Sequence, residues 1–328
     1  MRLAEDILAG DRRALARAIT VVESTRADHR ADAAALINEL LPHTGSGIRL
    51  GVSGPPGVGK STFIEALGLH VIGRGHRLAV LAVDPSSSRT GGSILGDKTR
   101  MGELARQPDV FIRPSPGAGQ LGGVARRTRE AMLLCEASGF DVVIVETIGV
   151  GQSEVAVADM VDLFLLLVSP GGGDELQGIK RGIMELADLV VVNKADGDLA
   201  AAAGRTAADY ANAVHLLRPR WRSWTTEVLT CSALEHRGID EVWHAVERFR
   251  AAVEGSGELQ AARARQATSW MWSEIRDALL DRFRADPAVA AQLPALEEAV
   301  ATGRIAPTEA ARELLDTFTN RPDRGTRS

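Results

Sequence analysis

One octapeptide constrains the fold of this chain more than any other segment: Gly54-Pro55-Pro56-Gly57-Val58-Gly59-Lys60-Ser61. It follows an apolar run, Ile48–Ser53, that predicts a strand, and it precedes a run, Thr62–Gly73, that predicts a helix. Glycines let successive backbone N–H groups turn inward around phosphate groups, and the helix adds its positive N-terminal end. We therefore predict a phosphate-binding loop in which Lys60 reaches the β- and γ-phosphates, Ser61 ligates Mg²⁺ and Thr62 also contacts the nucleotide.

Alternating strand and helix patterns continue from Ile48 to about Val253. Five further strands are expected at short runs, most of them continuously apolar, as in parallel strands that are covered on both faces: Leu78–Asp84, Asp141–Glu146, Leu163–Ser169, Leu189–Asn193 and Glu227–Thr230. Such alternation implies right-handed βαβ units. The sequence thus predicts an α/β fold, with a doubly wound, mostly parallel sheet forming a P-loop NTPase core over residues 46–254.

Helical patterns flank this core on both sides. In residues 1–45, Asp11 is the expected N-cap of an apolar stripe, and a second stripe follows before Pro42; the stripe residues are Leu15, Ile19 and Val22, then Leu36, Ile37, Leu40 and Leu41. Residues 255–328 predict a helical arm that ends in a polar tail. Within the arm one helical face carries Trp272, Ile275, Leu279 and Phe283, a pattern that fits internal packing and a dimer face equally well.

Charge and cysteine content exclude several classes of protein. The chain has 38 basic and 43 acidic side chains, a net charge of −5, so no basic surplus indicates nucleic acid or an anionic membrane as a partner. The longest apolar runs, such as Leu163–Val168, are too short to span a bilayer, and the N-terminus is acidic where a signal peptide would be apolar. Two cysteines, Cys135 and Cys231, exclude a disulfide framework. We expect a cytoplasmic protein.

A second motif predicts recognition of guanine. Asn193-Lys194-Ala195-Asp196 ends the expected strand Leu189–Asn193, and an aspartate there can accept hydrogen bonds from the ring N–H and the exocyclic amine of guanine, which adenine does not offer. Lys194 would lay its stem along the base, and Asn193 would tie this loop to the phosphate-binding loop. After the last strand, Ser232-Ala233-Leu234 resembles the loop whose backbone supports the guanine carbonyl in GTPases.

Candidates for metal binding and catalysis lie between these two motifs. Glu146-Thr147-Ile148-Gly149 follows a strand where most GTPases have Asp-x-x-Gly, so Glu146 is expected to hold Mg²⁺ and Gly149 to sense the γ-phosphate. Asp84 and Asp97 could each approach Mg²⁺ or an attacking water. For Asp84 the alternative is a helix cap at the strand end, and for Asp97 it is an ordinary loop aspartate.

Lysine is rare enough for its positions to be informative. The 38 basic residues include only four lysines: Lys60, Lys98, Lys180 and Lys194. Lys60 and Lys194 belong to the two nucleotide motifs, while Lys98 and Lys180 lie in segments whose glycine content suits mobile switch loops. Lys180 therefore joins Lys60, Asp84, Asp97 and Glu146 as a candidate for catalysis. The alternative is that Lys98 and Lys180 are ordinary solvated charges.

Together these stretches resemble the MeaB/ArgK family of P-loop GTPases. The resemblance is carried by Gly54–Ser61, Asp84–Met101, Glu146–Glu154, Gly171–Lys180 and Asn193–Asp196. It implies a G-protein chaperone that binds GTP and GDP with Mg²⁺ and docks on adenosylcobalamin-dependent methylmalonyl-CoA mutase or a related acyl-CoA mutase, gating cofactor loading and protecting the enzyme. It also implies a homodimer held by the C-terminal arm, and a switch loop at Gly171–Lys180 that contacts the mutase.

Two other functions compete with this interpretation. The first is an ATP-dependent kinase or ATPase linked to amino-acid transport, which would have no need of the guanine motif Asn193–Asp196. The second is a metallochaperone GTPase that delivers nickel. Such proteins usually carry clusters of cysteine and histidine, whereas the seven histidines of this chain are scattered, for example His70, His76 and His215.

Overall fold

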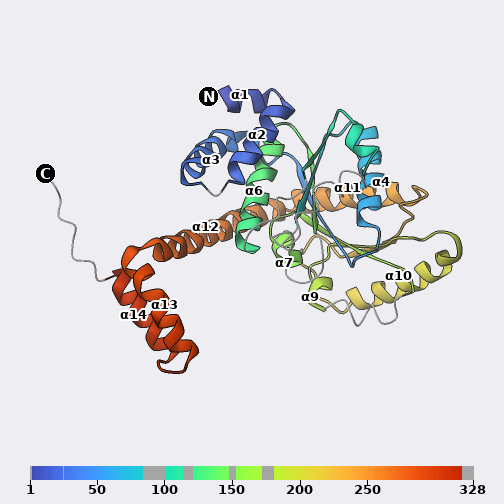
Figure 1. Cartoon of the computed structure of the whole chain (residues 1–328). Coiled ribbons are helices and arrows are strands. Elements are labelled where there is room, and N and C mark those ends of the chain that lie inside the picture. The colour runs from blue at the N-terminus through green and yellow to red at the C-terminus, as the bar shows by residue number, and fades with distance from the viewer. Residues whose placement is uncertain are drawn as a thin grey trace. The chain divides into compact units, whose positions relative to one another are not determined.

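The computed structural model of the chain describes residues 2–24, 26–83, 101–113, 121–147, 153–171 and 181–319. The chain divides into two compact units, Met1–Gln266 and Ala267–Ser328. The first unit contains a parallel β-sheet with helices on both faces, and the second is helical where it is described (Figure 1). Among the described residues, no helix is long and apolar enough to cross a membrane.

Seven strands form the sheet of the first unit, in the order β3-β2-β4-β1-β5-β6-β7, and every neighbouring pair is parallel. In chain order the strands are β1 (Ile48–Ser53), β2 (Leu78–Val83), β3 (Val110–Arg113), β4 (Val142–Thr147), β5 (Leu163–Val168), β6 (Leu189–Val192) and β7 (Glu227–Thr230). Every residue of β1, β2, β4, β5 and β6 is buried, since both faces are covered. The predicted doubly wound α/β fold is confirmed.

Strand β3 is the one strand of the described chain that the sequence pattern does not predict. It has four residues, lies at the edge of the sheet beside β2, and is buried only in its first half. A short apolar run that is half exposed carries little of the periodicity on which strand prediction depends. The edge position explains the weak signal, because β3 pairs on one side only.

Helices cover the sheet on both faces. On one face α4 (Lys60–Gly73) and α11 (Ile239–Gly255) pack with Leu50 and Val52 of β1 in the main hydrophobic core. On the other face α7 (Ser153–Ala158) approaches β1 so closely that a Cβ on Gly51 would lie 2.9 Å from Cγ1 of Val157. The remaining helices around the sheet are α6 (Leu121–Ala137), which contacts β2 and β4, α9 (Arg181–Met184), and α10 (Ala200–Val214), which contacts β6 and β7.

Three α-helices of the described chain precede the sheet, namely α1 (Arg2–Leu8), α2 (Arg12–Val22) and α3 (Ala27–Leu40), and all three contact α6. Asp11 caps α2 as predicted, because its carboxylate accepts hydrogen bonds from the backbone N–H groups of Arg13 (2.7 Å) and Ala14 (3.0 Å). Those bonds lower the pKa of Asp11 below its usual value. The predicted stripe of α2 is buried, whereas Leu41 of the second stripe is 51% exposed, just beyond the end of α3.

The described second unit comprises the end of α12 (Glu258–Ala285) together with α13 (Pro287–Ala301) and α14 (Pro307–Thr319). Asp286 caps α13, and the rings of Phe283 and Phe318 meet edge to face with centroids 5.4 Å apart. Trp272 and Leu279 are 56% and 52% exposed, so helices α13 and α14 of the same unit do not cover them. Internal packing therefore accounts for Phe283 of this stripe but not for Trp272 or Leu279.

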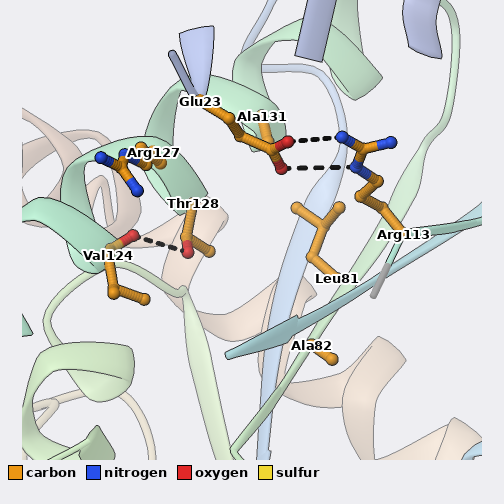
Figure 2. Close-up of a pocket in the computed structure, with 8 residues that line it drawn as sticks. All are labelled: Glu23, Leu81, Ala82, Arg113, Val124, Arg127, Thr128 and Ala131. Atoms are coloured by element: carbon orange, nitrogen blue, oxygen red, sulfur yellow. Dashed lines mark hydrogen bonds and ion pairs between the residues drawn. The ribbon is translucent and has the colours of Figure 1, made fainter. Parts of the chain in front are cut away.

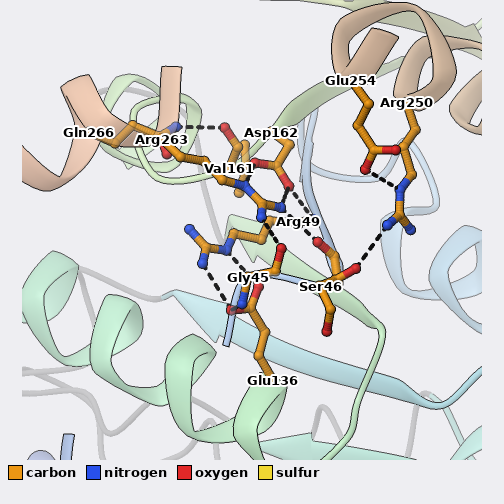
Figure 3. Close-up of polar contacts among 11 residues, drawn as sticks. Gly45, Ser46, Arg49, Glu136, Val161, Asp162, Arg250, Glu254, Arg263 and Gln266 are labelled. Atoms are coloured by element: carbon orange, nitrogen blue, oxygen red, sulfur yellow. Dashed lines mark hydrogen bonds and ion pairs between the residues drawn. The ribbon is translucent and has the colours of Figure 1, made fainter. Parts of the chain in front are cut away.

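A buried polar network lies where β1 and β5 begin (Figure 3). Asp162 accepts hydrogen bonds from the backbone N–H of Arg49 (2.9 Å) and from Nε (2.9 Å) and Nη2 (2.6 Å) of Arg263, which lies near the start of α12. Arg49 in turn pairs with Glu136 of α6 at 2.8 and 2.9 Å. The Asp162 side chain is 1% exposed and that of Arg263 is 18% exposed. The network therefore attaches α6 and the first turns of α12 to the end of the sheet at which β1 and β5 begin.

We expect Asp162→Ala to lower the free energy of unfolding by about 3 kcal/mol, because the Arg49 N–H loses its acceptor and the Arg263 guanidinium loses its paired carboxylate, keeping only the carbonyls of Gly45 and Gly47. Urea denaturation of the purified chain measures the loss. Arg250→Ala is the matched control: Arg250 pairs with Glu254, where the two side chains are 36% and 39% exposed, and donates to the Ser46 carbonyl at 2.8 Å, so its loss should cost no more than about 1.5 kcal/mol. Equal losses for the two variants would contradict the burial argument.

Candidate nucleotide-binding site

The turn between β1 and α4 has the backbone geometry of a phosphate-binding loop. Gly57 and Gly59 have φ values of 80° and 93°, which favour glycine, and Gly59 is the N-cap of α4. Gly54 lies against β5, where a Cβ would come within 2.4 Å of the Leu167 carbonyl oxygen. The helix begins at Lys60, two residues before the predicted start, and its first bond runs from the N–H of Phe63 to the Gly59 oxygen at 2.9 Å.

Lys60 folds back over this loop. Its Nζ donates hydrogen bonds to the carbonyl oxygens of Gly54 (2.7 Å) and Pro55 (3.2 Å). Partial burial lowers the pKa of Lys60, while the negative charges of Glu146 and Glu154 oppose that shift. The ammonium group is therefore held against the carbonyls of its own loop, and the charges of two carboxylates favour its protonated form.

The hydroxyl of Ser61 faces a carboxylate from the neighbouring strand. Val52 of β1 is paired in register with Glu146 of β4, and Ser61 Oγ donates to Glu146 Oε1 at 3.5 Å. Glu146 is 4% exposed. In the part of the chain that the structure describes, no group of three or more His, Cys, Asp or Glu residues could hold a metal by itself. A hydroxyl and one carboxylate leave most ligand positions to phosphate oxygens and water, which suits Mg²⁺.

Asn193 joins the phosphate-binding loop to the loop after β7. Its Nδ2 donates to the Val58 carbonyl at 2.9 Å, and its Oδ1 accepts from the Ala233 N–H at 3.1 Å. The side chain passes so close to the first loop that a Cβ on Gly59 would lie 2.8 Å from Nδ2. Asn193 is 2% exposed, so both bonds are protected from water.

The other residues of the second motif lie beside this junction. Lys194 has a φ of 60°, uncommon for a residue with a side chain, and its Nζ donates to the Gly57 carbonyl at 2.7 Å. The Asp196 carboxylate accepts a hydrogen bond from the hydroxyl of Ser232. Leu234 is 77% exposed. The structure thus brings together residues 54–61, 193–196 and 232–234 from three separate parts of the sequence.

Several candidate residues lie outside the described part of the chain. They are Asp84, Asp97, Lys98, Gly149 and Lys180. Their predicted roles at the metal, the γ-phosphate and the switch loops remain predictions. Strands β2 and β4, which lead into two of these segments, pair with each other through Ala82 opposite Glu146.

Three residues near the site receive no role from the sequence patterns. Glu154 of α7 is fully buried and its charge acts on Lys60, yet its neighbours in sequence give no sign of this. Cys231 lies 3.5 Å from Asn193 Oδ1, and burial, aided by the charge of Asp196, raises the pKa of its thiol to about 12. Arg237 donates to the Ala195 carbonyl at 2.6 Å. Long-range contacts of this kind leave no local periodicity to detect.

A small pocket opens near the ends of β2 and β3, bounded by α2 and α6 (Figure 2). Its volume is about 20 Å³, room for about one water molecule. Glu23 at the end of α2 pairs there with Arg113 at the end of β3. The pocket is too small for a nucleotide, and the pair fastens the N-terminal helices to the sheet edge.

Known proteins are similar to this chain in sequence and in fold. The family model described as "Methylmalonyl Co-A mutase-associated GTPase MeaB" matches residues 15–288. A Caulobacter vibrioides protein described as "Putative GTPase" is 59% identical over 312 residues, covering 95% of each chain. A Mus musculus protein, "Methylmalonic aciduria type A homolog, mitochondrial", is 49% identical over 330 residues, covering 98% of this chain and 80% of that protein. A crystal structure of LAO/AO transport system kinase matches with a TM-score of 0.76 and 41% identity, covering 97% of this chain and 96% of that chain.

Two glycine substitutions separate steric clash from backbone strain in the phosphate-binding loop. We expect Gly54→Ala to destabilise the protein by about 3 kcal/mol or more, because the added Cβ would meet a backbone oxygen of β5 at 2.4 Å. Gly57→Ala meets nothing within 4 Å and carries only the cost of its φ of 80°, about 1–2 kcal/mol. Thermal and urea denaturation of both variants measure the difference, and a Gly57 variant that is less stable than the Gly54 variant would contradict this assignment.

Proposed function

The chain belongs to the MeaB family and is a GTPase, and we propose that it acts as a Mg²⁺-dependent G-protein chaperone for an adenosylcobalamin-dependent acyl-CoA mutase, with methylmalonyl-CoA mutase as its client. GTP binding and hydrolysis would switch the chaperone between states that differ in affinity for the mutase and so gate cofactor loading. The observation that carries the nucleotide assignment is the Asn193 junction, because it holds Asp196 and Lys60 on adjoining loops.

In this proposal the two motifs divide the recognition of the nucleotide. Residues 54–62 bind the phosphates through backbone N–H groups, the Lys60 ammonium and the helix N-terminus. Asp196 accepts hydrogen bonds from the ring N–H and amine of guanine, Lys194 covers the base, and the loop 232–234 supports its carbonyl. A carboxylate left unpaired by adenine is costly, so the site should select GTP and GDP over adenine nucleotides.

The donors near Lys60 fit a magnesium ion. Ser61 Oγ and Glu146 Oε1 are hard oxygen donors that lie 3.5 Å apart on adjoining elements. Ser61 would ligate the ion, and Glu146 would hold it through its carboxylate. Bound Mg²⁺ would neutralise charge on the β- and γ-phosphates. We propose the remaining roles for residues outside the described chain: Asp84 and Asp97 near the metal or the attacking water, Gly149 at the γ-phosphate, and Lys180 in a switch loop that meets the client.

Two observations support the proposed partners: the descriptions of related proteins suggest the mutase, and an exposed apolar helix face suggests a homodimer. The matching family model is described as mutase-associated, and the mouse relative is named for methylmalonic aciduria. Residues 255–328 would form a dimerisation arm, since the helix face with Trp272, Ile275 and Leu279 presents three exposed apolar side chains. A second copy of the chain would bury that face. We further propose a cytoplasmic location, without nucleic acid or membrane as a partner.

We expect Asp196→Asn to change the base preference of the nucleotide site from guanine to xanthine. The amide presents a donor to the exocyclic amine of guanine, whereas xanthine has a carbonyl at that position. Loss of the guanine bonds should weaken GDP binding about 100-fold or more, and XDP should bind the variant more tightly than GDP does. Calorimetry with both nucleotides and Mg²⁺ tests this. Asp198→Asn changes an exposed aspartate two residues away and should leave GDP binding intact; GDP binding by the Asp196 variant at the unaltered affinity would refute the base assignment.

Binding of the chain to purified methylmalonyl-CoA mutase tests whether that enzyme is the client. We expect it to co-elute with this chain, with an affinity that differs at least about tenfold between a non-hydrolysable GTP analogue and GDP, a coupling of about 1.4 kcal/mol. Lys60→Ala should abolish that difference, because it removes the phosphate contact through which the nucleotide acts. Equal affinity for the mutase in both nucleotide states, or no complex in either, would overturn the chaperone proposal while leaving the GTPase assignment in place.

The kinase alternative has one observation in its favour, the description of the matching crystal structure as a transport system kinase. A kinase that uses ATP gains nothing from a carboxylate positioned for a guanine amine. Competition between ATP and GTP for the purified chain separates the two functions. Equal affinities would favour the kinase, and a strong preference for GTP would exclude an ATP-dependent enzyme.

A further inference from the structure

We propose that Arg237 is a positioning residue for guanine selection, acting on Asp196 through the Ala195 peptide. The inference deepens the proposed function and rests on it. Arg237 lies just before α11, forty-one residues beyond Asp196 in the sequence, and no motif includes it. Its guanidinium nevertheless reaches the loop that carries Asp196, where Nη2 donates to the Ala195 carbonyl at 2.6 Å.

Both backbone polar groups of Ala195 are held by the loop after β7. The Ala195 N–H donates to the Cys231 carbonyl at 2.9 Å, and the Ala195 carbonyl accepts from Arg237. The preceding residue, Lys194, has a φ of 60°, a conformation that costs a residue with a side chain about 1 kcal/mol or more. The peptide before Asp196 therefore has its direction fixed by partners on a different loop.

Arg237 is itself fixed within that loop. Its backbone exchanges two hydrogen bonds with Ser232, at 2.9 and 3.1 Å, and its Nη1 pairs with Glu235 at 3.2 Å. The next residue, Gly238, has a φ of 75°, and a Cβ there would lie 2.6 Å from the Thr230 carbonyl oxygen, so the loop closes tightly on β7. The backbone of Arg237 is therefore held in place, and from it the exposed side chain reaches both Glu235 and the Ala195 carbonyl.

The contact sets the orientation of the guanine-reading carboxylate. Ser232 donates to Asp196 from the same loop, and that bond fixes one carboxylate oxygen. Without Arg237, the Ala195 carbonyl loses a charge-assisted partner and the peptide before Asp196 gains freedom to rotate. The two hydrogen bonds to guanine would then be made with poorer alignment. The bond to the exocyclic amine exists for guanine and not for hypoxanthine, which lacks that amine.

Nucleotide binding by Arg237→Ala and Arg237→Lys tests the inference, with GDP, IDP and ADP as probes in the presence of Mg²⁺. We expect Arg237→Ala to weaken GDP binding about five- to tenfold and IDP binding by less, so that the ratio of the IDP and GDP dissociation constants falls about threefold or more. The lysine variant keeps one donor and should recover part of that ratio. ADP binding should remain weak in all variants.

Arg248→Ala is the matched control, because Arg248 is an exposed arginine that pairs with Glu227 at 2.6 Å and contacts neither nucleotide loop in the described chain. Its nucleotide ratio should equal that of the unaltered protein. Equal weakening of GDP and IDP by Arg237→Ala would show a purely structural role and overturn the inference, as would unchanged affinities for both nucleotides. If the unaltered chain itself fails to prefer GDP over IDP and ADP, the proposed guanine site fails, and the inference falls with it.

Discussion

The candidate site depends on one buried side chain, that of Asn193. Its amide carries a donor and an acceptor in one rigid plane, and each is used by a different loop: Nδ2 by the Val58 carbonyl and Oδ1 by the Ala233 N–H. No charged or apolar residue of that size offers both. Because Asn193 is 2% exposed, water does not compete for either bond, and the phosphate-binding loop and the loop after β7 are held at a fixed separation.

Strand β5 runs from this site to the opposite end of the sheet, where its first residues lie. Its Leu167 carbonyl lies where Gly54 of the phosphate loop must pass, and the residue just before its start, Asp162, holds Arg263 near the root of α12. All six residues of β5 are buried, and close packing on both faces makes such a strand rigid. The phosphate-binding loop at one end and the start of α12 at the other are therefore attached to the same strand of the first unit.

Local patterns accounted for much of the fold. The strands β1 and β7 have the predicted bounds, and the Asp11 cap lies where the apolar stripe placed it. The missed strand β3 and the early start of α4 have a common cause. Val110–Arg113 is a short, half-exposed edge run, and Lys60 and Ser61 are polar, so neither segment shows the hydrophobic periodicity from which elements are predicted.

Local sequence patterns predicted the phosphate-binding loop, the guanine motif and six of the seven strands of the sheet, because glycine spacing, strand length and apolar runs are local properties. Which loops become neighbours depends on how the strands pack in the sheet. Because the strands are parallel, β1, β6 and β7 all end on the same side of the sheet. The pairing of β6 with β7 makes the loops after them neighbours, which brings Ser232 to Asp196 and Arg237 to Ala195. Contacts across about forty residues depend on how whole strands pack, and no short stretch of sequence encodes that packing.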